Sequence, residues 1–452
     1  MTANAIQMPQ PSNCLIIGLG LTGLSCARFL ALHDIDVAVM DTRVEPPALT
    51  VLQQQHPEVV VKTGGLDVEW MKQADMIVLS PGVDPRLPEI VAAKEAGVEM
   101  VGDIELFARY ANAPVVAITG SNGKSTVTTL LADMAEQAGK NIAVGGNLGT
   151  PALDLISEDA PDFYIVELSS FQLETVNSLN AFAATILNVS PDHLDRYDSI
   201  EDYQQAKARV FNGDGVMVIN RDDTVVDQLS QPKRNQIGFS LHETQGVDFG
   251  LIEKDGQQFL AEGEQTLIAV DDMKIMGKHN VANALAALAL GSAMALPMAA
   301  MLSALTNYMG LPHRCRYVAN ISNSRWFNDS KATNVGATIA AIEGIADHGK
   351  LILILGGIAK DQDFSALTQV LAKSVRAVIL IGQDASLIEK VIPEFVTSYH
   401  VADMKSAVHK ADEVVTSGEN VLLSPACASF DMFSGYEERG NTFEQLVLEL
   451  SQ

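Results

Sequence analysis

Short runs of apolar, often β-branched residues alternate along the chain with longer stretches in which apolar residues recur at helical spacing. Strands buried on both faces form continuous apolar runs, whereas amphipathic helices repeat every 3.6 residues. The alternation therefore predicts an α/β fold, with parallel sheets covered by helices on both faces. Strands are predicted at 14–17, 37–40, 76–79, 115–119, 164–166, 185–187, 351–355, 378–381 and 421–423.

Two places break this alternation. Residues 251–260 contain an Asp255-Gly256 pair, which is typical of a two-residue turn in an antiparallel hairpin. A second antiparallel pair of strands is predicted around Asn323-Ser324, between residues 317–321 and 325–327.

The most apolar stretch covers residues 281–305. It is rich in alanine and is interrupted by Asn283, Ser292 and Pro297. This composition predicts a buried helix or a helical hairpin inside the protein rather than a membrane span.

A length of 452 residues favours more than one domain. Seams near 110–114 and 309–312 each precede a fresh run of strands. We therefore predict three α/β domains, at residues 1–111, 112–311 and 312–452, with binding clefts between them.

The formal net charge of -26 argues against a nucleic-acid partner, since a polyanion would be repelled. Anionic small substrates are not excluded, because lysines, arginines and helix N-termini can gather locally. The four cysteines lie far apart, which favours reduced thiols. The first residues lack the basic and apolar regions of a signal peptide, so we expect a cytoplasmic protein.

The strongest motif is TGSNGKST at residues 119–126, between an apolar run and a helical stretch. Its glycines allow backbone N–H groups to approach phosphate oxygens, its lysine can reach the terminal phosphates, and a hydroxyl can hold Mg²⁺. Ile118 stands where the strict motif has its first glycine. The motif predicts nucleotide binding by Gly120, Ser121, Asn122, Gly123, Lys124, Ser125 and Thr126.

A second glycine loop, GLGLTG at residues 18–23, follows the first predicted strand, and Asp41 ends the next one. This is the form of a dinucleotide fingerprint with its ribose-binding acid. It is compatible with NAD or a UDP-sugar, and also with tight strand–helix packing alone.

Two further candidates lie at strand ends. Glu167 follows a predicted strand and is either a Mg²⁺ ligand or an acid at a helix N-terminus. His193 lies between Asp192 and Asp195 after the next strand, where it is a candidate metal ligand.

Lys207 occupies an unexpected position. Ser199 and Asp202 have the spacing of a capping box that opens a helix. On that helix the spacing predicts a buried stripe formed by Ile200, Tyr203, Lys207 and Val210. The lysine either extends to solvent or is a desolvated amine whose pKa is lowered.

Taken together, the motifs resemble the Mur ligase family over the whole chain. The strings, in order, are IIGLGLTGLS, ITGSNGKST, GGNLGTP, VELSSFQLE, PDHLDRY, QQAKARVF, GKHNVANALAALAL, GLPHRC, NDSKATN, LILGG and LSPACASFD. Within the family they are most similar to members that add D-glutamate to UDP-N-acetylmuramoyl-L-alanine.

The resemblance implies a Rossmann-like N-terminal domain, a P-loop-type central ATPase domain and a Rossmann-like C-terminal domain. It implies an ATP-dependent amide ligase of peptidoglycan precursor synthesis that forms an acyl phosphate. The expected cofactors are ATP, Mg²⁺ at two sites and a carbamylated Lys207. The expected partners are the small substrates, with no nucleic acid or membrane, and the chain is expected to be a monomer.

The resemblance also assigns roles to single residues. Lys124, His193 and Lys207 would be catalytic. The UDP substrate would contact Leu21, Thr22, Asp41, Thr42, Arg43, Gly82 and Asn147. ATP would also contact Asn280, Asn283, Arg314 and Asp329. D-glutamate would contact Lys331, Thr333, Lys360, Ser429, Phe430 and Tyr436, the last at a position where related sequences can carry Phe. The metal ligands would be Ser125, Thr126, Glu167, His193 and Lys207.

Three alternatives remain at this stage. An NAD-dependent dehydrogenase would use the glycine loop at residues 18–23 but not the loop at 119–126. A regulatory nucleotide switch would use only the loop at 119–126. The nearest competitor is a ligase of the same family for another amino acid, or a folylpolyglutamate-type synthetase.

Overall fold

The computed structural model describes residues 11–190, 196–231, 233–242, 248–346, 349–359 and 362–450. The chain forms two compact units, and each is described by itself. The first comprises Met1–Gly250, Glu262–Glu264 and Leu285–Met301. The second comprises Leu251–Ala261, Gln265–Ala284 and Leu302–Gln452.

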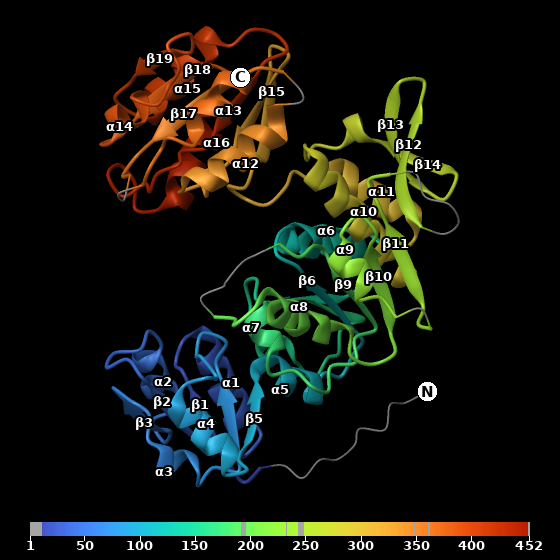
Figure 1. Cartoon of the computed structure of the whole chain (residues 1–452), viewed down its shortest axis with the longest axis vertical. Helices are drawn as coiled ribbons and strands as arrows, with labels where there is room; N and C mark the ends of the chain where they lie inside the picture. Colours follow the sequence, from blue (N-terminus) through green and yellow to red (C-terminus); the bar gives the residue numbers. More distant parts are fainter. Residues whose placement is uncertain are drawn as a thin grey trace. The chain divides into compact units, whose positions relative to one another are not determined.

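The N-terminal sheet is parallel throughout, with the strand order β3-β2-β1-β4-β5 (Figure 1). The chain adds strands to one side of β1 as far as β3 and then to the other side from β4 onwards. Ligands of open α/β sheets bind at such a switch point, here between β1 and β4. The elements are β1 Asn13–Ile17, α1 Leu21–Leu32, β2 Asp36–Asp41, α2 Leu49–Gln55, β3 Val60–Thr63, α3 Val68–Met71, β4 Met76–Leu79, α4 Pro88–Glu95, β5 Glu99–Gly102 and α5 Asp103–Tyr110.

The central sheet has nine strands in the order β14-β13-β12-β11-β10-β9-β6-β8-β7. Parallel pairing connects β10, β9, β6, β8 and β7. The elements are β6 Val115–Thr119, α6 Lys124–Gln137, β7 Ile142–Gly146, η1 Ala152–Leu155, β8 Phe163–Glu167, α7 Ser170–Leu173, β9 Ala183–Ile186, α8 Ile200–Ala208, η2 Arg209–Phe211, β10 Val216–Asn220, α9 Thr224–Gln228, β11 Gln236–Phe239, β12 Phe249–Lys254, β13 Gln257–Glu262, β14 Gln265–Ala269, η3 Val270–Asp272, α10 Lys278–Ala293 and α11 Met298–Asn307.

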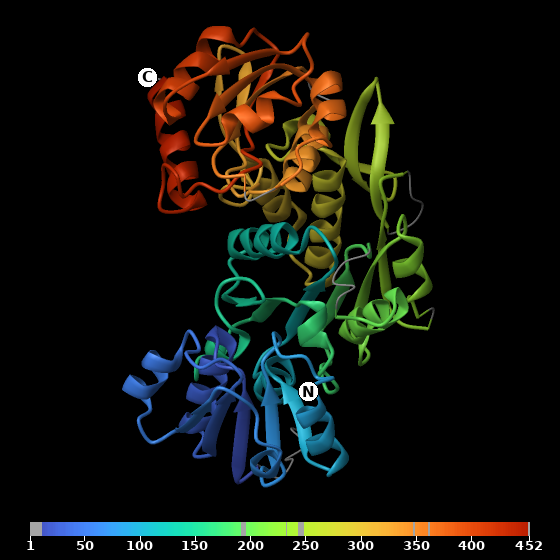
Figure 2. The same cartoon turned by 60° about the vertical axis from the view of Figure 1, so that its left-hand side comes forward.

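The C-terminal sheet has six strands in the order β15-β16-β20-β17-β18-β19, and it is drawn in orange and red in Figure 2. In this sheet, among the described residues, the β15–β16 pair is antiparallel and the other pairs are parallel. The elements are β15 Arg316–Ile321, β16 Ser324–Asn328, α12 Val335–Ile345, β17 Leu351–Gly356, α13 Leu367–Ser374, β18 Val375–Ile381, α14 Ala385–Glu389, β19 Thr397–His400, α15 Met404–Val414, β20 Asn420–Leu423 and α16 Tyr436–Leu450. Every residue of β17 is buried, as its unbroken apolar sequence predicts.

Both predicted hairpins are present. The turn between β12 and β13 is Asp255-Gly256, and both residues have positive φ, as a type I′ turn requires. The turn between β15 and β16 is Ser322-Asn323, with φ of 52° and 66°. The predicted Asn323-Ser324 turn was therefore displaced by one residue, because Ser324 already pairs with Ile321.

The apolar stretch forms two helices, α10 and α11, with Pro297 just before α11. Among the described residues, no helix is both long enough and apolar enough to cross a membrane. The prediction of a helical hairpin inside the protein is confirmed. The three sheets also confirm the predicted fold class, while the boundaries at residues 111 and 311 stay a prediction.

Gly356, at the end of β17, provides a test of this packing. Its φ is 126°, and an added Cβ would lie 1.9 Å from the Ile381 carbonyl oxygen. We predict that Gly356→Ala destabilises the C-terminal sheet by about 2 kcal/mol or more, through backbone strain and overpacking. Urea unfolding would be followed by Trp326 fluorescence in a Trp70→Phe background.

The matched control is Gly336→Ala in α12, where no atom lies closer to the new Cβ than 3.5 Å. Alanine there should stabilise by up to about 1 kcal/mol, since glycine disfavours helix. Equal unfolding midpoints for the two variants would contradict the packing described here.

Candidate functional site

A cavity of about 550 Å³ lies at the carboxyl ends of β1, β2 and β4. Asn147, Pro151 and Gln172 add a wall from the central sheet. The structure brings together here all the residues predicted to contact the UDP substrate, namely Leu21, Thr22, Asp41, Thr42, Arg43, Gly82 and Asn147. Their roles in binding stay a prediction.

The glycines of the 18–23 loop and of the neighbouring segment at Gly82 have two different roles. A Cβ on Gly23 would lie 2.0 Å from the Gly18 carbonyl oxygen, so tight strand–helix packing does require glycine there. Gly20 and Gly82 instead line the cavity, and an added Cβ at either would meet nothing within 4 Å. The loop therefore both packs closely and leaves room for a ligand to approach the backbone.

Asp41 is the most deeply buried of the charged residues that line this cavity. It is 2% exposed and accepts hydrogen bonds from the Leu19 N–H at 2.7 Å and from Arg43 Nη2 at 2.6 Å. Burial alone would raise the pKa of Asp41, but the bonds from Arg43 and Leu19 outweigh it and lower the pKa. An ionised carboxylate and a half-exposed guanidinium thus face the ligand space together.

The phosphate loop connects β6 to α6. Gly120 and Gly123 both have positive φ, and Gly123 is the N-cap of α6. Lys124 Nζ donates to the carbonyl oxygens of Gly120 at 2.8 Å and Ser121 at 3.0 Å. Asn188 braces the loop, since its side-chain oxygen accepts from the Asn122 N–H at 2.8 Å. The helix N-terminus and loop thus form an anion-binding turn.

Lys207 lies beneath this loop. Its side chain is 2% exposed, and its Nζ donates to the Gly120 carbonyl oxygen at 3.0 Å. The Nζ also lies 4.6 Å from the centre of the Tyr203 ring, and the Tyr203 hydroxyl is 2.8 Å from Ser121 Oγ. The alternative in which the lysine extends to solvent is therefore wrong. Of the predicted stripe, Tyr203, Lys207 and Val210 are buried and Ile200 is half-buried.

Glu167 ends β8 and is also buried. Its Oε1 accepts from Asn147 Nδ2 at 2.6 Å. Its Oε2 is buried without a hydrogen-bond partner among the described residues, which fits a carboxylate oxygen that binds a cation. Ser169 and Gln172 form the capping box of α7, so Glu167 does not cap this helix.

No cluster of three His, Cys, Asp or Glu side chains suited to a metal occurs in the part of the chain that the structure describes. Mg²⁺ commonly uses one or two carboxylates, with water and substrate phosphates as its other ligands. Glu167 and the hydroxyls of Ser125 and Thr126 fit that pattern. His193 and Lys360 lie outside the described residues.

The second unit contains the other predicted site residues. On α10, Asn283 Nδ2 donates to Asn280 Oδ1 at 3.1 Å. Asp329 ends up buried after β16, where it accepts from the Cys315 N–H at 3.1 Å and from Ser424 Oγ at 2.8 Å. Burial raises the pKa of Asp329 to about 7.

Lys331 and Tyr436 lie together in the same unit, with Lys331 Nζ 3.3 Å from the Tyr436 hydroxyl and 5.0 Å from its ring centre. Burial, followed by the nearby Arg314 charge, lowers the pKa of Lys331. Of the remaining predicted residues, Ser429 is buried, Phe430 is 65% exposed, and the Thr333 N–H donates to the Lys331 carbonyl oxygen at 2.9 Å.

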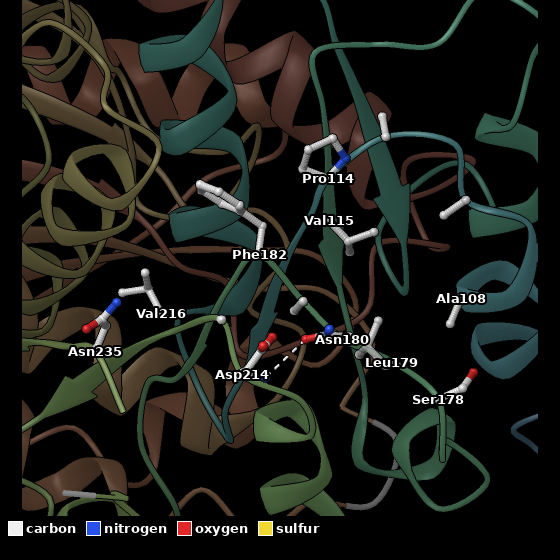
Figure 3. Close-up of a pocket in the computed structure, with 14 residues that line it drawn as sticks. Ala108, Pro114, Val115, Ser178, Leu179, Asn180, Phe182, Asp214, Val216 and Asn235 are labelled. Atoms are coloured by element: carbon white, nitrogen blue, oxygen red, sulfur yellow. Dashed lines mark hydrogen bonds between the residues drawn. The ribbon is translucent and has the colours of Figure 1, made fainter. Parts of the chain in front are cut away.

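A second cavity, of about 460 Å³, lies in the first unit at the amino ends of β6, β9 and β10 (Figure 3). Its lining includes Pro114, Val115, Phe182 and Asp214. None of the predicted site residues that the structure describes lines it. The described residues that are predicted to act in the central domain lie instead at the carboxyl edge of the central sheet or at the helix that follows it.

Comparisons with known proteins address the family. Three family models match the chain: the Mur ligase MurD-like N-terminal domain at residues 12–102, the Mur ligase middle domain at 118–291 and the Mur ligase glutamate ligase domain at 313–427. The chain belongs to the Mur ligase family. It is 53% identical over 100% of its length to the UDP-N-acetylmuramoylalanine–D-glutamate ligase of Nitrosococcus oceani, of which 99% is covered. It is 50% identical to the Pseudomonas aeruginosa ligase of the same name, over 97% of this chain and 98% of that protein.

Solved structures support the fold of this Mur ligase. It resembles the UDP-N-acetylmuramate-alanine ligase of Thermotoga maritima, with a TM-score of 0.55, 17% identity, and coverage of 98% of this chain and 100% of that one. A UDP-N-acetylmuramoyl-L-alanyl-D-glutamate–2,6-diaminopimelate ligase gives a TM-score of 0.60 at 19% identity, covering 89% and 99% of the two chains. The family assignment removes the dehydrogenase and the nucleotide switch as alternatives.

Sequence reasoning missed Arg439, which is fully buried in this Mur ligase. Its guanidinium donates to Ser330 Oγ at 2.9 Å, to the Ser330 carbonyl oxygen at 2.8 Å and to the Cys427 carbonyl oxygen at 3.0 Å. It therefore ties the segment before Lys331 to the segment before Ser429. The signal was available, since Arg439, Phe443 and Val447 share one buried face of α16 at spacings of four residues.

The buried Asp329 predicts a pH-dependent stability. Its pKa is raised from 3.8 to about 7, so the folded unit binds the proton more tightly than the unfolded chain. Stability should therefore fall as pH rises from about 4 to about 7 and then level off. Asp329→Asn resembles the protonated acid and should gain up to about 4 kcal/mol over the wild type across this range, at about 1.4 kcal/mol per pKa unit.

Urea unfolding at several pH values measures this difference. Asp363→Asn is the control, because Asp363 is exposed and hydrogen bonds from Ser365 lower its pKa. The contribution of Asp363 to stability should therefore rise with pH, opposite to that of Asp329. A difference between Asp329→Asn and the wild type that stays constant with pH would exclude a raised pKa at this site.

Proposed function

We propose that this Mur ligase joins D-glutamate to UDP-N-acetylmuramoyl-L-alanine at the expense of ATP, in peptidoglycan precursor synthesis. The observation that supports it most directly is the bond between Asn147 and Glu167. Asn147 lines the nucleotide-sugar cavity, and Glu167 ends the strand that pairs with β6, from which the phosphate loop emerges. One polar contact thus connects the cavity to the ATP side of the central sheet.

The first step is phosphoryl transfer. A carboxylate oxygen of UDP-N-acetylmuramoyl-L-alanine attacks the γ-phosphorus of ATP, the bond from that phosphorus to the β,γ-bridging oxygen breaks, and ADP leaves. Lys124 leaves its loop carbonyls and neutralises charge on the transferring group. The product is an acyl phosphate, which makes the otherwise uphill amide bond accessible.

The second step is acyl transfer. The amine of D-glutamate attacks the acyl carbon, a proton leaves the nitrogen, and inorganic phosphate departs. In this proposal Lys331, Lys360 and Thr333 bind the two carboxylates of glutamate, while Ser429 and the segment of Phe430 and Tyr436 complete the site. The lowered pKa of Lys331 still leaves an amine that can donate to a carboxylate.

Mg²⁺ would be held by Ser125 or Thr126, Glu167, His193 and Lys207, where it would supply positive charge to the phosphate oxygens. The orphaned Glu167 Oε2 supports this assignment. We also propose two metal positions, a monomeric enzyme and a cytoplasmic site of action. Asn280, Asn283, Arg314 and Asp329 would also contact ATP.

Carbamylation of Lys207 is part of the proposal. Lys207 and Lys124 both donate to the Gly120 carbonyl oxygen, so two ammonium groups would crowd one acceptor in a buried place. Carbon dioxide bonded to the neutral Lys207 amine, with loss of one proton, gives a carbamate with a single negative charge. That change removes the repulsion and supplies oxygen ligands for a hard cation.

The test of the function is phosphate release with ATP and UDP-N-acetylmuramoyl-L-alanine, offered D- and L-glutamate in parallel. We expect turnover with the D-isomer that exceeds turnover with the L-isomer by at least ~10², because misplacing the attacking amine is commonly that costly. Lys124→Ala is the inactive control, with a loss of ~10² or more. Release with L-alanine or diaminopimelate instead of D-glutamate would assign the chain to another ligase of the family.

A second prediction concerns Lys207→Ala. The variant should lose nearly all activity, and acetate should restore part of it by placing a carboxylate where the carbamate stood. The measurement is phosphate release against acetate concentration. Chloride at equal ionic strength, and acetate added to the wild type, are the controls. Full activity without acetate would refute a role for a modified Lys207.

A further inference from the structure

The segment after β4 has one side on the cavity and one side on the central sheet. Ser80, Gly82 and Asp84 line the nucleotide-sugar cavity, whereas Arg86 is not among the lining residues. Arg86 Nη2 lies 2.8 Å from Asp84 Oδ2, and Arg86 Nη1 lies 3.0 Å from Asp198 Oδ1. One guanidinium therefore connects the cavity wall of the N-terminal sheet to a residue that belongs to the central sheet.

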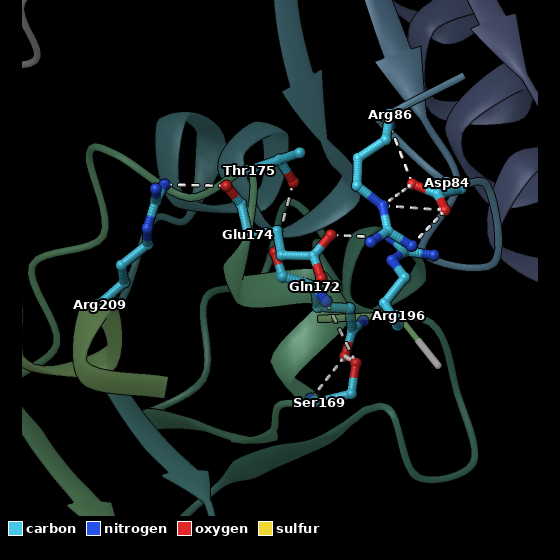
Figure 4. A network of polar contacts seen from close by, with 8 residues as sticks. All are labelled: Asp84, Arg86, Ser169, Gln172, Glu174, Thr175, Arg196 and Arg209. Atoms are coloured by element: carbon cyan, nitrogen blue, oxygen red, sulfur yellow. Dashed lines mark hydrogen bonds and ion pairs between the residues drawn. The ribbon is translucent and has the colours of Figure 1, made fainter. Parts of the chain in front are cut away.

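Arg196, two residues before Asp198, contacts the α7 region of the central side. The Arg196 guanidinium makes a 2.7 Å ion pair with Glu174 and lies 4.5 Å from the centre of the Phe171 ring. Arg209 Nη1 donates to the Glu174 carbonyl oxygen at 2.8 Å. Figure 4 shows Glu174 with Arg86 and Arg196 on one side and Arg209 on the other. The segment that carries Asp198 is therefore attached to the α7 region through Arg196.

The element after Asp198 adds to this connection. Ser199 is the N-cap of α8, and Lys207 near the other end of α8 donates to Gly120 in the phosphate loop. The cavity itself has walls from both sheets, with Asn147 and Gln172 on the central side. Its shape therefore depends on how the two sheets are fastened.

We propose that Arg86 is a positioning residue, which fastens the Gly82–Asp84 wall of the cavity to the start of α8 and thereby sets the affinity for the nucleotide-sugar substrate. The inference rests on the proposed function for the identity of that substrate. It assigns no contact between Arg86 and the substrate, because the guanidinium is directed at Asp84 and Asp198.

The expected change in substrate affinity follows from the exposure of the two side chains. The Arg86 and Asp198 side chains are 45% and 83% exposed, so solvent and salt screen their attraction. Exposed pairs of this kind change an equilibrium by about two- to fivefold. The pair therefore tunes an affinity and does not decide whether the enzyme works.

The experiment is a double-mutant cycle with Arg86→Ala, Asp198→Ala and the combination. Asp198→Ala is the decisive variant for two reasons. It leaves the Asp84–Arg86 pair in place, and Asp198 is not among the residues that line the cavity. We expect each single change to raise KM for UDP-N-acetylmuramoyl-L-alanine about two- to fivefold, with kcat and KM for ATP changed less than about twofold. The double variant should be no worse than Arg86→Ala.

The matched control is Lys72→Ala, which removes a 2.9 Å pair with Glu69 of similar exposure inside the N-terminal sheet domain. Its KM should equal the wild-type value. At 0.5 M sodium chloride the KM ratio between Asp198→Ala and the wild type should approach one. A wild-type KM for Asp198→Ala at low salt, or effects of the two changes that multiply in the double variant, would overturn the inference.

Failure of the proposed function has a different signature. In that case the wild type itself would release no phosphate with UDP-N-acetylmuramoyl-L-alanine. The same cycle is then measured as UDP affinity by calorimetry, with the same two- to fivefold changes expected. Equal UDP affinity for the wild type and Asp198→Ala would overturn the positioning role.

Discussion

The carbonyl oxygen of Gly120 accepts hydrogen bonds from two lysines, Lys124 and Lys207, and the rest of the site is arranged around that contact. Lys124 begins α6 and follows the loop it bonds to, whereas Lys207 arrives from α8, more than eighty residues later. A buried ammonium is costly unless polar partners compensate it, so the position of Lys207 is a specific feature of this site.

The fold brings the groups of the site together because parallel strands place their carboxyl ends at one edge of a sheet. In the central sheet β6 lies between β9 and β8, so the phosphate loop, Asn188 and Glu167 emerge side by side. In the N-terminal sheet the cavity lies at the corresponding edge, at the switch point between the paired strands β1 and β4. N–H groups and cations such as Arg43 and Lys124 lie at these edges, so an acidic chain is not excluded from binding anions there.

Much of this could be predicted from the sequence, because the signals were local. An apolar run such as 351–355 is typical of a strand that is buried on both faces. Residues that follow such strands lie at one edge of a parallel sheet. Strands such as β3 and β19 escaped prediction because they are short and partly exposed. The one-residue error at Ser322-Asn323 arose because several polar residues there tolerate positive φ. The helical spacing of Arg439, Phe443 and Val447 could have indicated that Arg439 is buried. It could not have indicated the partners of Arg439, because these lie at Ser330 and Cys427 in the distant segments of the chain.

Two of the described contacts connect the N-terminal cavity to the central domain. They differ in strength because one is buried and the other is exposed. The bond from Asn147 to Glu167 is 2.6 Å long and ends on a buried carboxylate, so it is a charge-assisted bond in a medium of low polarity. The Arg86–Asp198 pair is exposed and screened. Breaking the first contact would leave a buried carboxylate without a side-chain partner among the described residues. Solvent and salt weaken the second contact, so its effect on the cavity is smaller. A site divided between two sheets thus gains precision from a buried contact and adjustability from an exposed one.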